Sequence, residues 1–161
     1  FKMTDFQIVL INSDYSANFK IKRDVLHKLL LETYQIFSHY EPCIYPGVNS
    51  KYYWNEDYRE YTSKGICHCT GNCTGKENGK GDGKCKRVTI SVFQSGNVII
   101  TGARSIQQIR DAYDFINYVF QNHYDILKRD ALPPPLDDTP SSSKNRTIIL
   151  LPKQKIKYTK N

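Results

Sequence analysis

The chain has 161 residues, 39% of them hydrophobic and 12% aromatic, which suits one globular domain with a modest core and appended segments. Its formal charge of +7 favours an acidic partner such as nucleic acid, although part of the excess lies beyond residue 144, where no acidic residue occurs. The sequence argues against a membrane or secreted protein: no apolar run approaches the roughly 20 residues of a membrane span, and no charged-then-apolar leader opens the chain. We therefore expect a soluble intracellular protein.

The N-terminal part predicts two strand segments and a helix. Residues 6–11 are apolar and β-branched enough for a largely buried strand, and residues 19–22 alternate as a half-exposed strand does. Asp24 is a suitable N-cap for a helix that ends near Ser38. Its expected apolar face consists of Leu26, Leu29, Leu30, Thr33 and Phe37.

The middle of the chain predicts a strand followed by an insertion. Residues 51–54 are aromatic and strand-like, and the prolines shortly before them favour a bent or edge strand. From residue 55 to about 85 the composition changes to Gly, Lys, Cys and Thr with almost no aliphatic residues. This segment is therefore expected to contribute nothing to a core.

A hairpin and a long helix follow the insertion. β-Branched runs flank Ser95-Gly96, which predicts a two-residue turn, because glycine tolerates the positive φ of tight turns. Ser105 is the expected cap of a helix whose apolar residues recur at intervals of three and four. These residues are Ile106, Ile109, Tyr113, Ile116, Phe120, Tyr124 and Leu127.

Together the elements predict an α+β fold: a curved antiparallel sheet with two helices on one face and the other face free. We expect β-branched and aromatic side chains on the free face, a surface type that marks interaction sites. The expected domain covers residues 1–130, with the insertion at 55–85. Residues 131–161 are expected to form a Pro/Ser-rich linker and a basic tail, in which the apolar run 148–151 is a candidate strand or partner segment.

Four cysteines of the insertion follow the pattern Cys-x-Cys-x3-Cys-x11-Cys. Zinc takes four thiolate or imidazole ligands from close turns, so Cys67, Cys69, Cys73 and Cys85 are a candidate structural zinc site. Their spacing differs from paired Cys-x2-Cys knuckles, so a metal-free reduced loop and a disulfide pair are the alternatives. Cys43 lies outside the cluster and is expected to be buried.

The sequence gives little support for catalysis. The four histidines lie in separate segments, and no Ser-His-Asp or paired-carboxylate constellation can be assembled. The Gly-Lys run at residues 79–84 lacks the spacing of a phosphate-binding loop and precedes a strand instead of a helix. We expect a protein that is not an enzyme and that takes no cofactor besides zinc.

Four short motifs occur in order: Tyr40-Glu41-Pro42, Tyr45-Pro46-Gly47, Phe93-Gln94-Ser95-Gly96 and Thr101-Gly102-Ala103-Arg104. They resemble the Tyr-Glu-Pro, Phe-Pro-Gly, Phe-x-Ser-Gly-Lys and Thr-Gly-Ala-Lys elements in the second repeat of the TATA-box-binding protein family. The resemblance covers roughly residues 6–129 without the insertion, and implies half of the saddle with which that family bends DNA from the minor groove. The insertion and the Pro-rich tail look like those of divergent versions from large nucleocytoplasmic DNA viruses.

The resemblance implies wedge residues and base contacts. Phe93 matches a phenylalanine that enters between base steps, and Tyr45 stands where its pair would be; unstacking a step costs a few kcal/mol. Ile99 and Thr101 share one strand face and are the candidate contacts to base edges. The family's base-reading asparagine falls at Leu10 in an ungapped match, so Asn12, two residues on, is the candidate here.

Arg104 and Lys86 are the candidate phosphate contacts. Asn97 stands where the family has a lysine, so specificity for TATA does not follow from the resemblance. Without the resemblance, Phe93 would be a core or cross-strand packing residue, and Arg104 an ordinary surface charge.

The predicted function is that of a transcription factor that binds and bends promoter DNA through an AT-rich minor groove, together with the transcription machinery. We expect it in the nucleus, or in a viral factory or virion in the host cytoplasm. One repeat is visible and the chain begins at Phe1, so a missing first repeat or a second copy is the expected partner. The alternatives are a protein–protein interaction module of a transcription complex and an accessory domain of a DNA-processing enzyme.

Overall fold

The computed structural model describes residues 9–59 and 64–130. In these ranges no helix is long and apolar enough to cross a membrane. The predictions for residues 6–8 and 131–161 lie outside the described ranges. In chain order the elements are β1 (Ile11–Ser16), α1 (Arg23–Glu32), β2 (Ser38–His39), β3 (Val48–Trp54), the 3-10 helix η1 (Glu56–Tyr58), β4 (Lys86–Val92), β5 (Asn97–Ala103), α2 (Ile106–Asn122) and α3 (Tyr124–Leu127).

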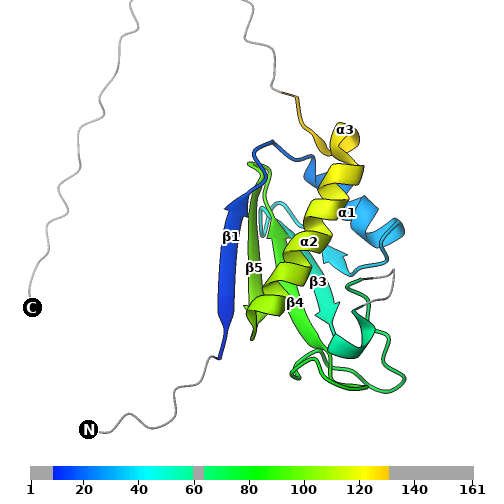
Figure 1. Ribbon diagram of the computed structural model, residues 1–161. Coiled ribbons are helices and arrows are strands. Elements are labelled where there is room, and N and C mark those ends of the chain that lie inside the picture. Colours follow the sequence, from blue (N-terminus) through cyan, green and yellow to red (C-terminus); the bar gives the residue numbers. More distant parts are fainter. Residues whose placement is uncertain (1–8, 60–63, 131–161) are drawn as a thin grey trace, which may run out of the picture. The chain divides into compact units, whose positions relative to one another are not determined.

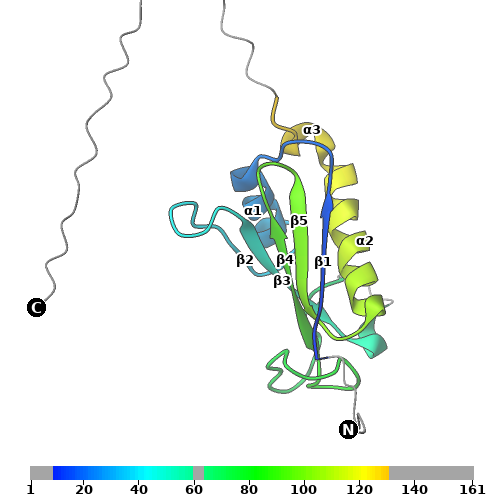
Figure 2. The same cartoon turned by 90° about the vertical axis from the view of Figure 1, so that its left-hand side faces the viewer.

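One antiparallel sheet in the order β1-β5-β4-β3-β2 forms the frame of the fold. α2 crosses in front of the strands in Figure 1, and the buried residues of α1 and α2 belong to one hydrophobic core with the sheet. Figure 2, in which β1 faces the viewer, shows α2 beside the sheet. The predicted α+β architecture, with helices on one face of an antiparallel sheet, is confirmed.

α2 begins as predicted, because the Ser105 side chain accepts a hydrogen bond from the backbone N–H of Gln108. Its buried stripe is centred on Ala112, Phe115 and Val119, and the predicted face is therefore partly wrong. Ile116 and Phe120 are buried as expected, whereas Ile106, Tyr113 and Tyr124 are exposed. The helix also ends at Asn122, and Leu127 is buried from the separate turn α3.

The N-terminal elements differ from the prediction. The strand is the polar segment Ile11–Ser16, Val9 and Leu10 before it are exposed, and residues 19–22 contribute only an isolated bridge from Ile21. Pairing with β5 and packing of Tyr15 against Tyr113 on α2, with ring centroids 4.7 Å apart, fix this strand. The apolar composition of residues 6–11 therefore did not predict where the strand lies.

α1 also differs, because it is shorter than predicted and capped differently. Lys22 is the N-cap residue, and its side chain makes no capping hydrogen bond. Asp24 lies in the first turn, where its carboxylate interacts favourably with the positive end of the helix dipole. The helix ends at Glu32, since Gln35 adopts a positive φ of 54°. Phe37, expected on the helix face, is 58% exposed.

The hairpin has a longer loop than predicted. The Phe93 N–H donates to the Asn97 carbonyl at 2.9 Å and the Gly96 N–H to the Phe93 carbonyl at 3.0 Å, which leaves a three-residue loop. Gly96 has a φ of 94°, and a Cβ there would lie 2.2 Å from the Phe19 carbonyl oxygen, so glycine is required. β3 is an internal strand and not an edge, because its prolines lie in the preceding loop.

Trp54, at the end of β3, connects the sheet, α2 and the insertion. Its indole N–H donates to Asp111 Oδ2 at 2.6 Å, and Arg59 pairs with the same carboxylate at 2.7 Å. Gly79, at a φ of 88°, lies against the indole so closely that a Cβ would come within 2.3 Å of it. The insertion thus packs on the core at this point, which the composition had not indicated.

We expect Asp111→Ala to lower the free energy of unfolding by about 1–3 kcal/mol, because a buried indole N–H loses its acceptor. Burial acts to raise the pKa of Asp111, but the hydrogen bonds from Arg59, Trp54 and Gln107 leave that pKa below its ordinary value. The contribution of the carboxylate should therefore be present at neutral pH and decline as the pH falls through the lowered pKa.

Urea unfolding, followed by the fluorescence of the chain's one tryptophan, measures this effect. Asp114→Ala removes an exposed acid from the same helix and should change stability by less than about 0.5 kcal/mol. Equal losses in the two variants would contradict the assigned role of Asp111.

Candidate nucleic-acid interface and metal centre

Alternation along the strands assigns each side chain to one side of the sheet. Val88, Ile90 and Ile100 are fully buried under the helices, so the residues between them project to the opposite side. We call this opposite side the free face. It consists of Asn12, Asp14 and Ser16 of β1, Asn97, Ile99 and Thr101 of β5, Arg87, Thr89 and Ser91 of β4, and Asn49, Lys51 and Tyr53 of β3.

The free face is mainly polar, so the expectation that it consists of β-branched and aromatic side chains is wrong. Ser91 donates to the Asn49 side-chain oxygen at 2.6 Å, and the Lys51 ammonium donates to the Thr89 hydroxyl at 3.0 Å. These contacts join neighbouring strands across the face. A partner of the free face would therefore meet mainly hydrogen-bonding side chains, together with the apolar side chain of Ile99.

Lys51 and Arg87 carry the positive charge of the free face. Burial lowers the pKa of Lys51, and the nearby Arg87 lowers it further. Neither residue forms an ion pair within the described ranges. Two cations held near each other without an acidic partner favour an anionic ligand.

Tyr45 and Phe93 lie together at one end of the sheet, as the resemblance implied for a wedge pair. Their ring centroids are 5.7 Å apart. Gly47 backs both rings, because a Cβ there would lie 2.7 Å from the Tyr45 ring and 3.2 Å from the Phe93 ring. Two loops distant in sequence thus present adjacent aromatic side chains.

Arg23, at the start of α1, joins these two loops. Its guanidinium donates to the Pro46 carbonyl and, at 2.9 Å, to the Gln94 side-chain oxygen. It also lies 5.2 Å from the Tyr40 ring centroid. Sequence analysis missed Arg23, because its partners lie 23 and 71 residues away and no local pattern marks it.

The other predicted site residues fall into two groups. Asn12, Ile99 and Thr101 lie on the free face, and Asn12 and Ile99 line an open depression of about 620 Å³ that reaches Phe93. Lys86 pairs with Trp54 and shares the parity of buried Val88, so it belongs to the helix-covered side. The exposed Arg104 follows β5, and its backbone N–H donates to Gln108 Oε1 at 2.8 Å.

Lys86 and Arg104 lie near each other, where β4 begins and β5 ends. Burial lowers the pKa of Lys86, and Arg104 and Arg87 lower it further. The structure brings the predicted base contacts together on the free face but places Lys86, one of the two predicted phosphate contacts, on the helix-covered side.

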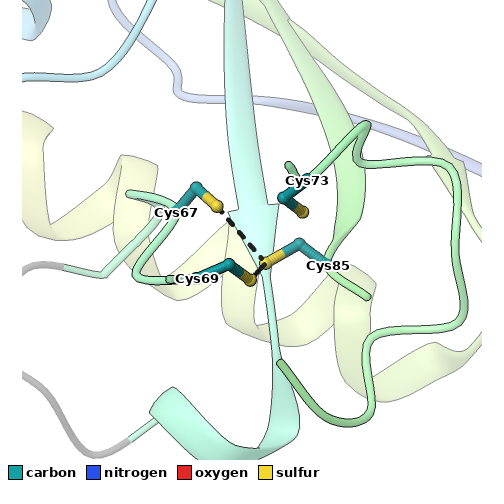
Figure 3. Close-up of side chains that lie close together, drawn as sticks. All are labelled: Cys67, Cys69, Cys73 and Cys85. Atoms are coloured by element: carbon teal, nitrogen blue, oxygen red, sulfur yellow. Dashed lines mark hydrogen bonds between the residues drawn. The ribbon is translucent and has the colours of Figure 1, made fainter. Parts of the chain in front are cut away.

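The four cysteines of the insertion converge (Figure 3). Their sulfur atoms all lie within 4.8 Å of one another, with Cys69 and Cys85 3.3 Å apart and Cys67 and Cys85 3.8 Å apart. A tetrahedral ion with Zn–S bonds of about 2.3 Å spaces its sulfur ligands by about 3.8 Å. The cluster can hold a metal ion. The cysteines in the described ranges are free thiols, and Cys43 is exposed instead of buried as predicted.

The cysteine-bearing segment is hydrogen-bonded to the end of β3 and the beginning of β4. The Gly65 carbonyl accepts from the Tyr53 N–H at 2.9 Å, and the Gly75 carbonyl from the Arg87 N–H at 2.7 Å. Gly75, at a φ of 69°, lies so close that a Cβ would be 2.8 Å from both the Tyr53 ring and the Arg87 Cβ. We call residues 65–85 the cysteine lobe; at Gly75 it lies on the free face beside Tyr53 and Arg87, and Arg87 stays exposed.

The sequence of this chain is similar to a known protein family and to a viral protein. The family model described as "Transcription factor TFIID (or TATA-binding protein, TBP)" matches residues 82–123, which hold β4, β5 and α2. A TATA-box-binding protein-like protein of Acanthamoeba polyphaga mimivirus is 31% identical over 124 residues, which are 77% of this chain and 29% of that protein. The chain thus spans less than a third of the length of this relative. By its fold, the family match and the viral relative, the chain is similar to divergent TATA-box-binding-protein-like proteins.

Proposed function

We propose that this chain binds duplex DNA with its free face and bends it by inserting Tyr45 and Phe93 into the minor groove. The family match and the relative support a transcription-related role in a family of non-enzymatic factors. The observation that carries the finer proposal is the Tyr45–Phe93 pair, backed by Gly47 and joined by Arg23 at the edge of a polar face. Paired aromatic side chains held this way can act as a wedge between base steps.

The chemistry of the free face supports the same proposal. The minor groove offers hydrogen-bond acceptors on its floor and phosphates along its walls. Asn12 and Thr101 can donate to base edges, and Ile99 can contact them by van der Waals forces. Lys51 and Arg87 are better placed for phosphates than Lys86, because they share the face with the base contacts.

A half-saddle grips little DNA, so the proposed partner is a further repeat or a second copy of this chain. The relative is much longer than the matched region, which leaves room for another repeat in such a polypeptide. We propose promoter DNA as the target and the nucleus, or a viral factory or virion, as the place of action.

A second candidate function is a protein–protein interaction module with the same fold. It is favoured by exposed apolar residues on α2, where Ile106 is 57% and Tyr118 is 59% exposed. These residues lie on the helix-covered side of the sheet, so the two functions can be tested with separate substitutions.

We also propose that Cys67, Cys69, Cys73 and Cys85 hold a structural zinc ion. Sulfur separations of 3.3 and 3.8 Å suit tetrahedral coordination, and the burial that raises the pKa of Cys85 makes a thiolate there depend on a compensating cation. The cysteine lobe has little apolar side-chain burial of its own, so the ion would supply much of its stability.

Phe93→Ala and Tyr45→Ala should each weaken binding of an AT-rich duplex about tenfold, since an aromatic ring stacked on a base contributes about 1–3 kcal/mol. Fluorescence anisotropy across a salt series measures the affinity, and energy transfer between dyes at the duplex ends measures the bend.

Tyr118→Ala, on the helix-covered side, is the control and should leave DNA affinity unchanged. Unchanged affinity in the Phe93 and Tyr45 variants would contradict the wedge proposal. Loss of a protein partner in the Tyr118 variant, with no DNA binding by the wild type, would favour the interaction module.

Purified protein should contain one zinc ion per chain, measured by native mass spectrometry. Cys69→Ser should lose the ion, whereas Cys43→Ser, which changes an exposed thiol outside the cluster, should keep it. Chelation should also shift Trp54 emission to longer wavelength, because Gly79 of the lobe packs on the indole. A wild-type chain without bound metal would refute the zinc proposal.

A further inference from the structure

Asp14 lies near the centre of β1, and the packing of its neighbour Tyr15 fixes the side of the sheet to which the Asp14 side chain projects. The next residue, Tyr15, packs against Tyr113 of α2 with ring centroids 4.7 Å apart, so Asp14 must project to the free face. It pairs with Ile99, and the same row continues through Ser91 and Asn49. The carboxylate is therefore presented on the free face proposed to meet DNA, along the edge strand β1.

Asp14 is also the acidic member of an otherwise neutral and basic set. The residues that define the free face include no other carboxylate, and Asp14 forms no ion pair within the described ranges. It lines the open depression of about 620 Å³ together with Asn12, Ser16 and Phe93. The carboxylate is exposed there and available to a ligand.

An ionised carboxylate accepts hydrogen bonds and donates none. The minor-groove edges of A·T and T·A pairs present acceptors only, so an A·T pair facing Asp14 would leave the carboxylate opposite a base acceptor. A G·C pair adds one donor to the minor groove, the N2 amino group of guanine. Asp14 is chemically matched to that pair and mismatched to the other.

The neighbours of Asp14 suit the adjoining base pairs. Asn12 and Ser16 project from the same side of β1 and carry groups that can donate to base acceptors. Ile99, opposite Asp14, offers an apolar contact. The strand thus presents an acceptor-only side chain between two side chains that can donate, which suits a G·C pair with A·T pairs on either side.

We propose that Asp14 determines DNA specificity by accepting a hydrogen bond from a guanine N2 amino group, so the preferred site holds a G·C pair within AT-rich sequence. This inference rests on the proposed DNA-binding function.

Two base analogues test the inference with the wild-type chain. AT-rich duplexes that carry one G·C pair at each successive position first identify the position with the highest affinity. Replacing that guanine by inosine removes only the N2 amino group, and should weaken binding about tenfold, as loss of one good base contact does. Placing 2,6-diaminopurine in an A·T duplex at that position adds the amino group and should restore the affinity.

Two variants test the residue. Asp14→Ala should bind the guanine and inosine duplexes equally, and bind the all-A·T duplex more tightly than the wild type does. Asp24→Asn removes an exposed acid from α1 and is the matched charge control: it should keep the wild-type ratio between the duplexes.

Equal wild-type binding to guanine and inosine duplexes, with binding still lost in Phe93→Ala, would overturn the role of Asp14 and leave the proposed function intact. A guanine preference that persists in Asp14→Ala would likewise overturn it. No binding to any duplex would overturn both proposals.

Discussion

The packing of α2 on the β4–β5 hairpin is the constraint on which the free face depends. Val88, Ile90 and Ile100 lie fully buried against the helix side, and burial of each such side chain contributes about 1.5–3 kcal/mol. Since strand side chains alternate, this burial forces the intervening residues Thr89, Ser91 and Ile99 outward. Their direction is thus set by a core that they do not join, and a one-residue shift of register would exchange the two sets.

Local patterns predicted what local interactions determine. The hairpin, the Ser105 cap and the cysteine cluster each depend on residues close in sequence, and the structure places all three as elements where the sequence indicated. The polar strand β1 escaped prediction, because its partners β5 and Tyr113 lie more than 80 residues away. The role of Arg23 also depends on distant packing, and propensity and periodicity carry no information on it. The side of the sheet that Lys86 occupies follows from the alternation that it shares with Val88, but the resemblance had assigned Lys86 to phosphate without regard to that alternation.

The free face is bounded at both ends by structures that glycine makes possible. At one end Gly47 allows Tyr45 and Phe93 to approach each other, and at the other Gly75 allows the cysteine lobe to lie on Tyr53 and Arg87. The proposed zinc ion would stabilise the second boundary, while Arg23 stabilises the first. The central strands lie between these boundaries, and variation in either boundary would change the length of surface open to the proposed duplex.

Both edges of the sheet are poor templates for unspecific strand addition. β2, at one edge, has only two residues, and β1, at the other, is polar and carries Asp14. Short or charged edges discourage the edge-to-edge pairing that leads to aggregation. A half-domain with such edges gains little from random strand pairing, so the proposed assembly with another repeat would have to rest on specific complementarity. The polarity of β1 thus has two consequences: it shapes the free face and it discourages edge-to-edge aggregation.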